Sequence, residues 1–263
     1  MNPSSKFQLV LLEKIKFEGT DVMSFKFNQR LDKLEEYYTP SLFEYNAGQY
    51  AYFDLDDVVG DNKGPTRHFT ISSSPTENFI MLTTKIRNSD YKQRLSDLEV
   101  GDTVDVRGPE GEFVLPEDKS KSLIFLSGGI GVTPFRSMLN YASDKRLPLK
   151  IMLFDSNKNQ QNILFKKEFD DLAALNENIK IIYTLSEDNS DMDNVIDTTD
   201  VRKGEKGRIN KEMIQKYVDM HTLNNSIYYI CGPPDMLKSM RSLLEDEMDI
   251  PKERVKIEEF TGY

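Results

Sequence analysis

The sequence predicts a two-domain protein: an antiparallel β-barrel over residues 1–118, then an α/β domain over residues 119–263 with a five-stranded parallel sheet and flanking helices. Two observations predict this fold class. In the first part, short aromatic and branched runs are separated by residues that favour turns. In the second part, apolar runs of strand length alternate with segments of helical periodicity.

The first 118 residues have the pattern of a closed or nearly closed antiparallel barrel. Met23, Phe25 and Phe27 alternate as in a half-buried strand. Residues 50–53 and 79–82 have the length and composition of further strands. Turn residues separate such runs at Gly48, Gly64-Pro65, Gly101-Asp102 and Gly108-Pro109.

Two segments of this half interrupt the strands. Residues 29–45 are polar and acidic and contain three tyrosines, so we expect a loop or a short helix inserted there. The spacing of Tyr91, Leu95 and Leu98 predicts one short helix before Gly101.

Strand and helix patterns alternate after residue 119. Apolar runs of strand length occupy residues 123–126, 151–154, 179–185, 227–230 and 255–260. Helical spacing is found at Phe165, Phe169 and Leu172, and again at Leu237, Met240, Leu244 and Met248. This alternation predicts a parallel sheet covered by helices on both faces. Residues 186–207 are acidic and polar, and we expect a mobile loop there.

Composition and charge exclude several classes of function. The single cysteine, Cys231, leaves no internal disulfide, cysteine-ligated iron–sulfur cluster or thiolate zinc site, and we expect no metal. No segment approaches the roughly 18 consecutive apolar residues of a membrane span. The formal net charge of −10 argues against a nucleic-acid partner. We expect a cytoplasmic protein, since a lone cysteine fits a reducing compartment.

A candidate phosphate-binding turn lies in residues 121–140, KSLIFLSGGIGVTPFRSMLN. A short apolar run enters a glycine-rich turn and then one helical face, made by Phe135, Met138, Leu139 and Ala142. The N–H groups and partial positive charge of a helix N-terminus suit a dinucleotide pyrophosphate. Thr133 is the expected N-cap, and Pro134 fits the first helical turn. The alternative is a tight strand-to-helix turn without a ligand.

Three further stretches complete an ordered set of motifs. They are Arg67-His68-Phe69-Thr70-Ile71-Ser72-Ser73-Ser74-Pro75, residues 83–86 with Tyr91-Lys92, and Cys231-Gly232-Pro233-Pro234-Asp235-Met236. With the glycine turn before the last of them, the chain resembles the ferredoxin–NADP reductase superfamily of flavin- and pyridine-nucleotide-binding reductases. The resemblance covers nearly the whole chain, including the acidic and aromatic end at residues 258–263. It implies an FAD-binding barrel followed by an NAD(P)-binding domain.

The resemblance implies a set of FAD contacts. These are Arg67, His68, Phe69, Thr70, Thr84, Lys85, Ile86, Tyr91, Lys92, Thr133, Phe260 and Tyr263. Arg67 would grip the flavin pyrophosphate through its bidentate guanidinium. Phe69 would lie against the isoalloxazine ring, and Thr70 would place its hydroxyl near flavin N5. Lys92 stands where relatives often carry a glycine–serine phosphate contact and would replace it as a point charge.

The remaining FAD contacts are implied more generally. Residues 84–86 would supply backbone contacts to the ribityl and phosphate portion. Phe260 or Tyr263 would cover the outer face of the flavin.

A second set of residues would contact NAD(P)H. These are Gly129, Gly131, Thr133, Pro134, Cys231, Gly232, Pro233 and Asp235. The resemblance also implies three catalytic residues: Thr70 on the barrel, and Cys231 and Glu258 beside the nicotinamide.

Charges after the second and third parallel strands bear on the choice between NADH and NADPH. Glu187 and Asp188 follow Ser186 and would repel a 2′-phosphate. Lys158 and Arg208 would instead attract it. We expect a slight preference for NADH.

Each residue also has an explanation that needs no ligand. Taken alone, Arg67 would be a surface ion pair, Phe69 a core residue, and Cys231 an inert buried cysteine. The order of the four stretches along the chain favours the joint interpretation.

The resemblance implies an FAD-dependent NAD(P)H oxidoreductase, a diaphorase like the ferredoxin–NAD(P) reductases. It would pass a hydride from NAD(P)H to flavin N5 and then single electrons to a separate acceptor, such as a ferredoxin, a flavodoxin or another redox protein. One alternative is an electron-transfer subunit of a larger redox complex. Another is a nucleotide sensor without catalysis, although the intact motif at Arg67–Thr70 argues against it.

Overall fold

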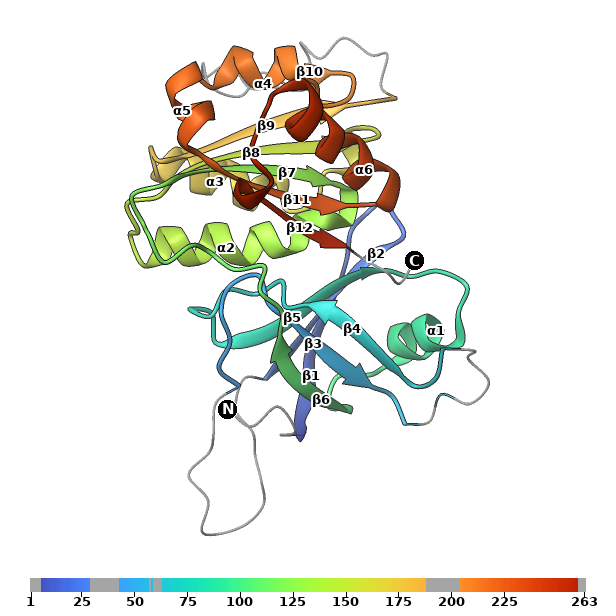
Figure 1. Ribbon diagram of the computed structural model, residues 1–263. Coiled ribbons are helices and arrows are strands. Elements are labelled where there is room, and N and C mark those ends of the chain that lie inside the picture. Colours follow the sequence, from blue (N-terminus) through green and yellow to red (C-terminus); the bar gives the residue numbers. More distant parts are fainter. Residues whose placement is uncertain (1–5, 29–42, 57, 59–62, 188–203, 260–263) are drawn as a thin grey trace. The chain divides into compact units, whose positions relative to one another are not determined.

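The computed structural model describes residues 6–28, 43–56, 58, 63–187 and 204–259 (Figure 1). The chain divides into two compact units, Met1–Val114 and Leu115–Tyr263. Within the described ranges, no helix combines the length and the hydropathy that a membrane crossing requires.

The first unit is an antiparallel sheet of six strands in the order β4-β3-β6-β1-β2-β5. The strands are β1 (Lys6–Lys16), β2 (Val22–Asn28), β3 (Tyr50–Asp54), β4 (Thr66–Thr70), β5 (Phe79–Lys85) and β6 (Thr103–Glu110). The two edge strands meet just beyond β4, where Ile71 forms a β-bridge with Leu82. The N–H of Ser72 also donates to the carbonyl of Met81 at 2.7 Å. The predicted barrel is therefore confirmed.

Aromatic side chains fill the inside of the barrel. Phe25, Phe27 and Phe53 have no exposed surface, and the rings of Phe27 and Phe53 lie 5.8 Å apart. The alternation that predicted β2 thus corresponds to its buried face. The predicted short helix is α1 (Asp90–Asp97), which buries Tyr91 and Leu95 against this core.

The second unit is a parallel sheet of six strands in the order β10-β9-β8-β7-β11-β12. The strands are β7 (Ser122–Gly128), β8 (Lys150–Asn157), β9 (Ile179–Leu185), β10 (Glu205–Lys206), β11 (Ile227–Gly232) and β12 (Val255–Glu259). The parallel sheet is confirmed, but it has one strand more than predicted. Two-residue β10 pairs with the end of β9, and so short a strand has no periodicity to detect. The loop predicted over residues 186–207 therefore includes a strand at Glu205–Lys206, and its residues 188–203 lie outside the described residues.

Helices cover both faces of this sheet. On one face, α2 (Thr133–Asp144) stacks Phe135 on Phe125 of β7 at 4.6 Å, and α3 (Lys166–Leu175) lies against β9. The other face carries α4 (Lys211–Tyr217), α5 (Met220–Asn225) and α6 (Pro234–Ser242), which continues into the π-helical turn η4 (Leu243–Glu247). Neighbouring side chains of a strand point to opposite faces of the sheet. Phe125 therefore packs against α2, and Ile124 packs on the face that carries α4, α5 and α6.

Candidate functional site

The residues predicted to hold the flavin lie on three elements of the first unit: β4, β5 and α1. Arg67, His68, Phe69 and Thr70 are consecutive on β4, and Thr84 and Lys85 end β5. Ile86 follows β5, and Tyr91 and Lys92 open α1. Cation–π contacts join β4 to α1, since the Arg67 guanidinium lies 5.0 Å over the Tyr91 ring and Lys92 Nζ lies 4.3 Å over the Phe69 ring.

Arg67 is held in place by backbone carbonyls. Its Nη1 donates to the carbonyls of Lys63 at 2.9 Å, Gly64 at 2.8 Å and Thr66 at 2.8 Å. The turn before β4 therefore fixes the direction of the guanidinium. A guanidinium fixed over an aromatic ring is suited to a planar, bidentate contact with phosphate.

Phe69 and Thr70 form the part of β4 that suits an aromatic ligand. The Phe69 ring is half-buried and rests on Phe53 and Tyr91, at ring separations of 5.8 and 6.0 Å. The Thr70 hydroxyl is buried and has no hydrogen-bond partner. A buried hydroxyl without a partner costs about 1–3 kcal/mol. An acceptor atom of a bound flavin beside Phe69 would remove that cost, so these residues fit FAD.

Lys92 brings a positive charge to the same group of residues. Its Nζ donates to the hydroxyl of Thr84, which is itself buried. Burial, and then the nearby guanidinium groups of Arg67 and Arg87, lower the pKa of Lys92 to about 7. A cation enclosed by other cations is suited to an anionic ligand such as a pyrophosphate.

Two predicted flavin contacts have hydrogen-bond partners within the first unit. The Tyr91 side chain has no exposed surface, and its hydroxyl donates to the carbonyl of Phe53 at 3.0 Å. Tyr91 therefore belongs to the barrel core beneath Phe69 rather than to an open surface. The N–H of Ile86, predicted as a backbone contact, donates to the carbonyl of Asp21 at 2.6 Å.

His68 points to the other side of β4 from its neighbours. Its ring packs against Tyr50 at 5.4 Å and Tyr52 at 5.8 Å. Burial lowers the pKa of His68. Nothing in these contacts joins His68 to the group around Lys92.

The glycine turn of the second unit connects β7 to α2 through the 3₁₀ turn η1 (Gly129–Val132). Gly129 has a φ of 55°, a left-handed conformation that glycine adopts without strain. A Cβ on Gly131 would lie 2.2 Å from the carbonyl oxygen of Cys231, and one on Gly128 would lie 2.2 Å from Sδ of Met236. The turn thus lies directly on the end of β11. The motif that begins at Cys231 is therefore packed against the glycine turn. The order of the two motifs in the sequence does not reveal this contact.

Thr133 is not the N-cap that the sequence predicts. Val132 precedes the helix in a helical conformation, and Thr133 is the first residue of α2. Both the N–H and the hydroxyl of Thr133 donate to the carbonyl of Ile130, the hydroxyl at 3.1 Å. The physical reason is the 3₁₀ turn, which supplies helical backbone one turn early. These contacts make Thr133 a support of the turn, and its contact with a cofactor stays a prediction. Pro134 does occupy the first helical turn as predicted.

Cys231 and Glu258 lie side by side in the sheet, because they are register partners on β11 and β12. Burial, and then the Glu258 carboxylate, raise the pKa of the Cys231 thiol, so it stays protonated and is a poor nucleophile. Burial raises the pKa of Glu258 to about 7. The predicted pair is therefore brought together.

The remaining predicted contacts lie at the ends of the same unit. Gly232 ends β11, and exposed Pro233 and Asp235 flank the start of α6. Phe260 and Tyr263 lie outside the described residues.

One buried polar cluster of the second unit was not predicted. Ser127 of β7 and Asp155 of β8 are register partners, and Asn157 Nδ2 donates to Asp155 Oδ2 at 2.8 Å. Oδ1 of Asn157 is buried there without a hydrogen-bond partner. Burial raises the pKa of Asp155 to about 6. The feature of the sequence that could have indicated this cluster is a single acidic residue, Asp155, near the end of an apolar strand.

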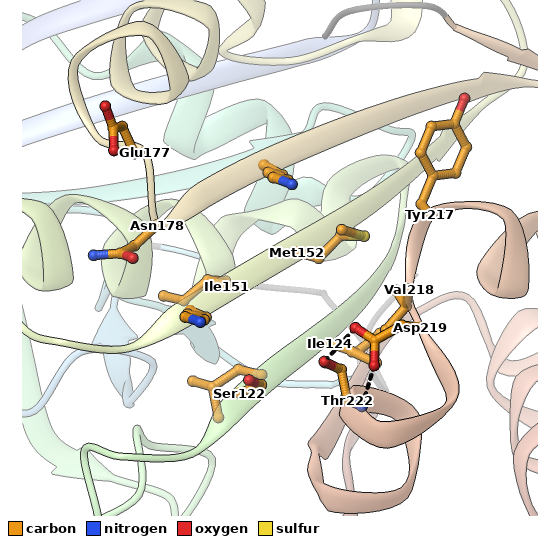
Figure 2. A pocket seen from close by; sticks show the side chains of 13 residues that line it. Ser122, Ile124, Ile151, Met152, Glu177, Asn178, Tyr217, Val218, Asp219 and Thr222 are labelled. Carbon is orange, nitrogen blue, oxygen red and sulfur yellow. Dashed lines mark hydrogen bonds between the residues drawn. The ribbon is translucent and has the colours of Figure 1, made fainter.

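A cavity of about 310 Å³ opens at the other end of the parallel strands (Figure 2). Ser122, Ile124 and Met152 lie on its floor, near the amino ends of β7 and β8. The turn between α4 and α5 forms a wall, where Asp219 accepts hydrogen bonds from the N–H and the hydroxyl of Thr222 at 2.9 and 2.7 Å. None of the predicted cofactor contacts lines this cavity.

Family comparison assigns both halves of the chain. Residues 9–115 match the oxidoreductase FAD-binding domain, and residues 125–242 match the oxidoreductase NAD-binding domain. The chain belongs to the ferredoxin–NADP reductase-like flavin oxidoreductases. The two matched domains give the chain an FAD-binding and an NAD-binding half, so FAD and NAD(P) are its cofactors.

Curated relatives of this flavin oxidoreductase include three kinds of redox protein. Flavohemoprotein A of Dictyostelium discoideum is 26% identical over 254 residues, 92% of this chain and 57% of the relative. A subunit of the Na(+)-translocating NADH-quinone reductase of Shewanella denitrificans is 26% identical, over 88% of this chain and 57% of the relative. NADH-cytochrome b5 reductase 1 of D. discoideum is 28% identical, over 74% and 65%. The chain thus spans about half to two thirds of the length of these relatives.

Solved structures show the same fold. Flavohemoglobin from Malassezia yamatoensis has a TM-score of 0.75 at 19% identity, with 97% of this chain and 60% of that chain covered. A ferredoxin NADP+ reductase from Neisseria gonorrhoeae has a TM-score of 0.70 at 18% identity, with 97% and 99% covered. The two-domain fold of this flavin oxidoreductase is therefore that of its family.

Proposed function

We propose that this oxidoreductase transfers a hydride from NAD(P)H to N5 of FAD and then passes single electrons to a separate redox protein, acting in the cytoplasm. The observation that carries the proposal is the partnerless, buried Thr70 hydroxyl beside the half-buried Phe69 ring. FAD, when bound, supplies the change from two-electron to one-electron chemistry. The protein's own task is then to bind, align and shield.

The residues divide this task between the two units. On the first unit, Arg67 and Lys92 would hold the pyrophosphate, Phe69 would support the ring, and Thr70 would donate a hydrogen bond near N5. On the second unit, the turn at Gly129–Val132 would hold the nucleotide pyrophosphate with its N–H groups. Glu258 would hold a proton beside the nicotinamide near neutral pH, as its raised pKa allows.

We propose NADH as the preferred donor. Lys158 Nζ forms an ion pair with Glu187 at 3.0 Å. Its positive charge is therefore already balanced and attracts a 2′-phosphate less strongly. The N–H of Glu187 donates to the carbonyl of Lys158, which keeps the two residues together. The names of two relatives, the NADH-quinone reductase and the NADH-cytochrome b5 reductase, also favour NADH.

A second candidate is an electron-transfer subunit or segment of a larger redox assembly. It is favoured by the relative that is part of a quinone reductase and by the partial coverage of the curated relatives. Size-exclusion chromatography of native extract separates this candidate from a free-standing reductase, because only a component of an assembly elutes with other proteins.

The decisive experiment is anaerobic reduction of the purified chain. We expect a yellow flavin spectrum that is bleached by NADH faster than by NADPH, and recovered when ferredoxin, flavodoxin or cytochrome b5 is added. A colourless protein that FAD cannot reconstitute would overturn the proposal. A flavoprotein that binds NADH without bleaching would indicate the nucleotide sensor instead.

A further inference from the structure

Lys92 is an enclosed amine without an acidic partner. Its Nζ donates to the Thr84 hydroxyl and lies 4.3 Å over the Phe69 ring. Among the residues that the structure describes, no carboxylate lies within ion-pair distance of it. Other lysines of the chain, such as Lys26 with Glu13 at 2.8 Å, do have such partners.

Within the described part of the first unit, the charged groups that act on Lys92 from neighbouring elements are two cations. Arg67 comes from β4, and Arg87 from the segment after β5, where Asp21 lies 3.7 Å from its Nε. Tyr91, on the same helix, has its pKa raised by burial and stays neutral. Burial and the two guanidinium groups therefore act together to lower the pKa of Lys92 to about 7. An isolated lysine would keep its proton to about pH 10.

We propose that Lys92 takes up a proton from solvent when FAD binds, so that the affinity for FAD is linked to pH through this one side chain. The inference rests on the proposed function, which places the flavin pyrophosphate between Arg67 and Lys92. Before binding, the –NH₂ form of Lys92 is substantially populated above neutral pH. The two negative charges of the pyrophosphate then favour –NH₃⁺, and the proton comes from water or buffer.

The linkage has a quantitative form. If the bound lysine stays charged up to pH 9, uptake is about 0.1 proton per FAD at pH 6 and about 0.9 at pH 8. The dissociation constant of FAD then rises about 50-fold between pH 7 and pH 9. The pyrophosphate does not titrate in this range, so the change belongs to the protein.

Calorimetry of the full chain freed of FAD tests this directly. FAD is titrated at pH 6 and pH 8 in phosphate and in imidazole, whose ionisation enthalpies differ, so that the difference in heat counts protons taken up. We expect buffer-dependent heat at pH 8 and almost none at pH 6. Equal heats in the two buffers at pH 8 would overturn the inference.

Two substitutions at the same position isolate the charge. Lys92→Arg keeps a permanent cation, so we expect tight binding that does not change with pH and no proton uptake. Lys92→Met removes the cation, so binding is weak at every pH and uptake is lost. Lys16→Met, at an exposed position of β1, is the matched control and leaves both unchanged. Proton uptake that survives in Lys92→Arg overturns the inference, and its loss in His68→Gln would assign it to that histidine.

Failure of the inference and failure of the proposed function are distinguishable. A wild-type chain that binds FAD without proton uptake contradicts only the role of Lys92. A wild-type chain that does not bind FAD at any pH contradicts the proposed function itself.

Discussion

Among the hydroxyls of the barrel that the structure describes, only that of Thr70 is buried without a hydrogen-bond partner. Thr83, by contrast, lies in a closed network, 2.7 Å from the hydroxyl of Ser24 and 2.9 Å from that of Ser72. Both threonines are buried on strands of the same sheet. The comparison shows that the Thr83 hydroxyl stabilises the fold, whereas the Thr70 hydroxyl is available for the proposed contact with the flavin.

Replacing Thr70 by valine should lower activity without destabilising the fold. We expect Thr70→Val to retain FAD but to slow flavin reduction by NADH about tenfold, since one hydrogen bond of about 1.4 kcal/mol is lost. Thr83→Val should do the opposite and destabilise the barrel by about 1–2 kcal/mol, because two hydroxyls lose a partner. Stopped-flow reduction and urea unfolding of both variants check this pair, and a Thr70→Val enzyme with the wild-type rate would contradict it.

Asp155 should make the protein less stable as pH rises. Its pKa is raised from 3.8 to about 6 in the folded state, so folding favours the protonated form. Stability therefore falls as pH increases from about 4 to about 6, by about 2–3 kcal/mol, and is level above that range.

The variant Asp155→Asn carries no charge at any pH. We expect it to be more stable than the wild type at pH 8 and to lose that advantage near pH 4. Asp171→Asn, which removes only an exposed carboxylate paired with Lys167, should change little at either pH. Urea unfolding at the two pH values measures the difference, and equal stabilities of Asp155→Asn and wild type at pH 8 would refute the assignment.

At the scale of elements, the turn between β7 and α2 depends on two glycines for different reasons. Gly129 needs a left-handed backbone, and the place that a Cβ would take there is open, with no atom within 4 Å. Gly131 needs the absence of a side chain, because the carbonyl oxygen of Cys231 occupies that place.

Alanine at the two positions should therefore have unequal effects. Gly129→Ala should cost about 1–2 kcal/mol of backbone strain, and Gly129→Asn less, because asparagine tolerates the left-handed conformation. Gly131→Ala must push β11 away from the turn, so we expect about 1–3 kcal/mol of destabilisation and a clearly raised KM for NADH. Steady-state kinetics with thermal unfolding distinguishes them, and a Gly131→Ala enzyme with an unchanged KM would argue against nucleotide binding at this turn.

The ends of β8 and β9 carry the ion pair between Lys158 and Glu187. Replacing Glu187 by glutamine frees the lysine without changing side-chain size, and we expect kcat/KM for NADPH to rise about fivefold, the effect of an exposed charge pair. NADH should be almost unaffected. The double variant Lys158→Ala with Arg208→Ala is the control, and its KM for NADH should match the wild type because NADH has no 2′-phosphate. A wild-type kcat/KM that is higher for NADPH than for NADH, and that falls for NADPH in this variant, would favour NADPH as the donor.

At the scale of the whole molecule, the spacing of apolar residues was enough to predict the fold class and the order of the elements. The Met23, Phe25 and Phe27 alternation and the apolar run at residues 179–185 correspond to β2 and β9 because burial on one or both faces of a sheet imposes that pattern. Strand β10 escaped prediction, since two residues held by β9 need no pattern of their own.

The candidate site was predictable where the motif itself sets the residue type. The glycines of the turn and the series from Arg67 to Thr70 are of this kind. Tyr91, Thr133 and Asp155 were not, because their roles depend on what folds against them: Phe69 above the tyrosine, a 3₁₀ turn before the threonine, and β7 beside the acid. Residue type alone does not reveal such neighbours.

The thioether of Met236 has a consequence for how this family can vary. It fills the space beside two glycines at once, since a Cβ on Gly128 would lie 2.2 Å from its sulfur and one on Gly232 would lie 2.9 Å from it. Gly128 lies about a hundred residues before Gly232 and Met236 in the sequence, yet the three positions share a single volume. We therefore expect substitutions at these positions to be correlated among relatives. Alanine at position 128 or 232 should be accompanied by a shorter side chain at position 236.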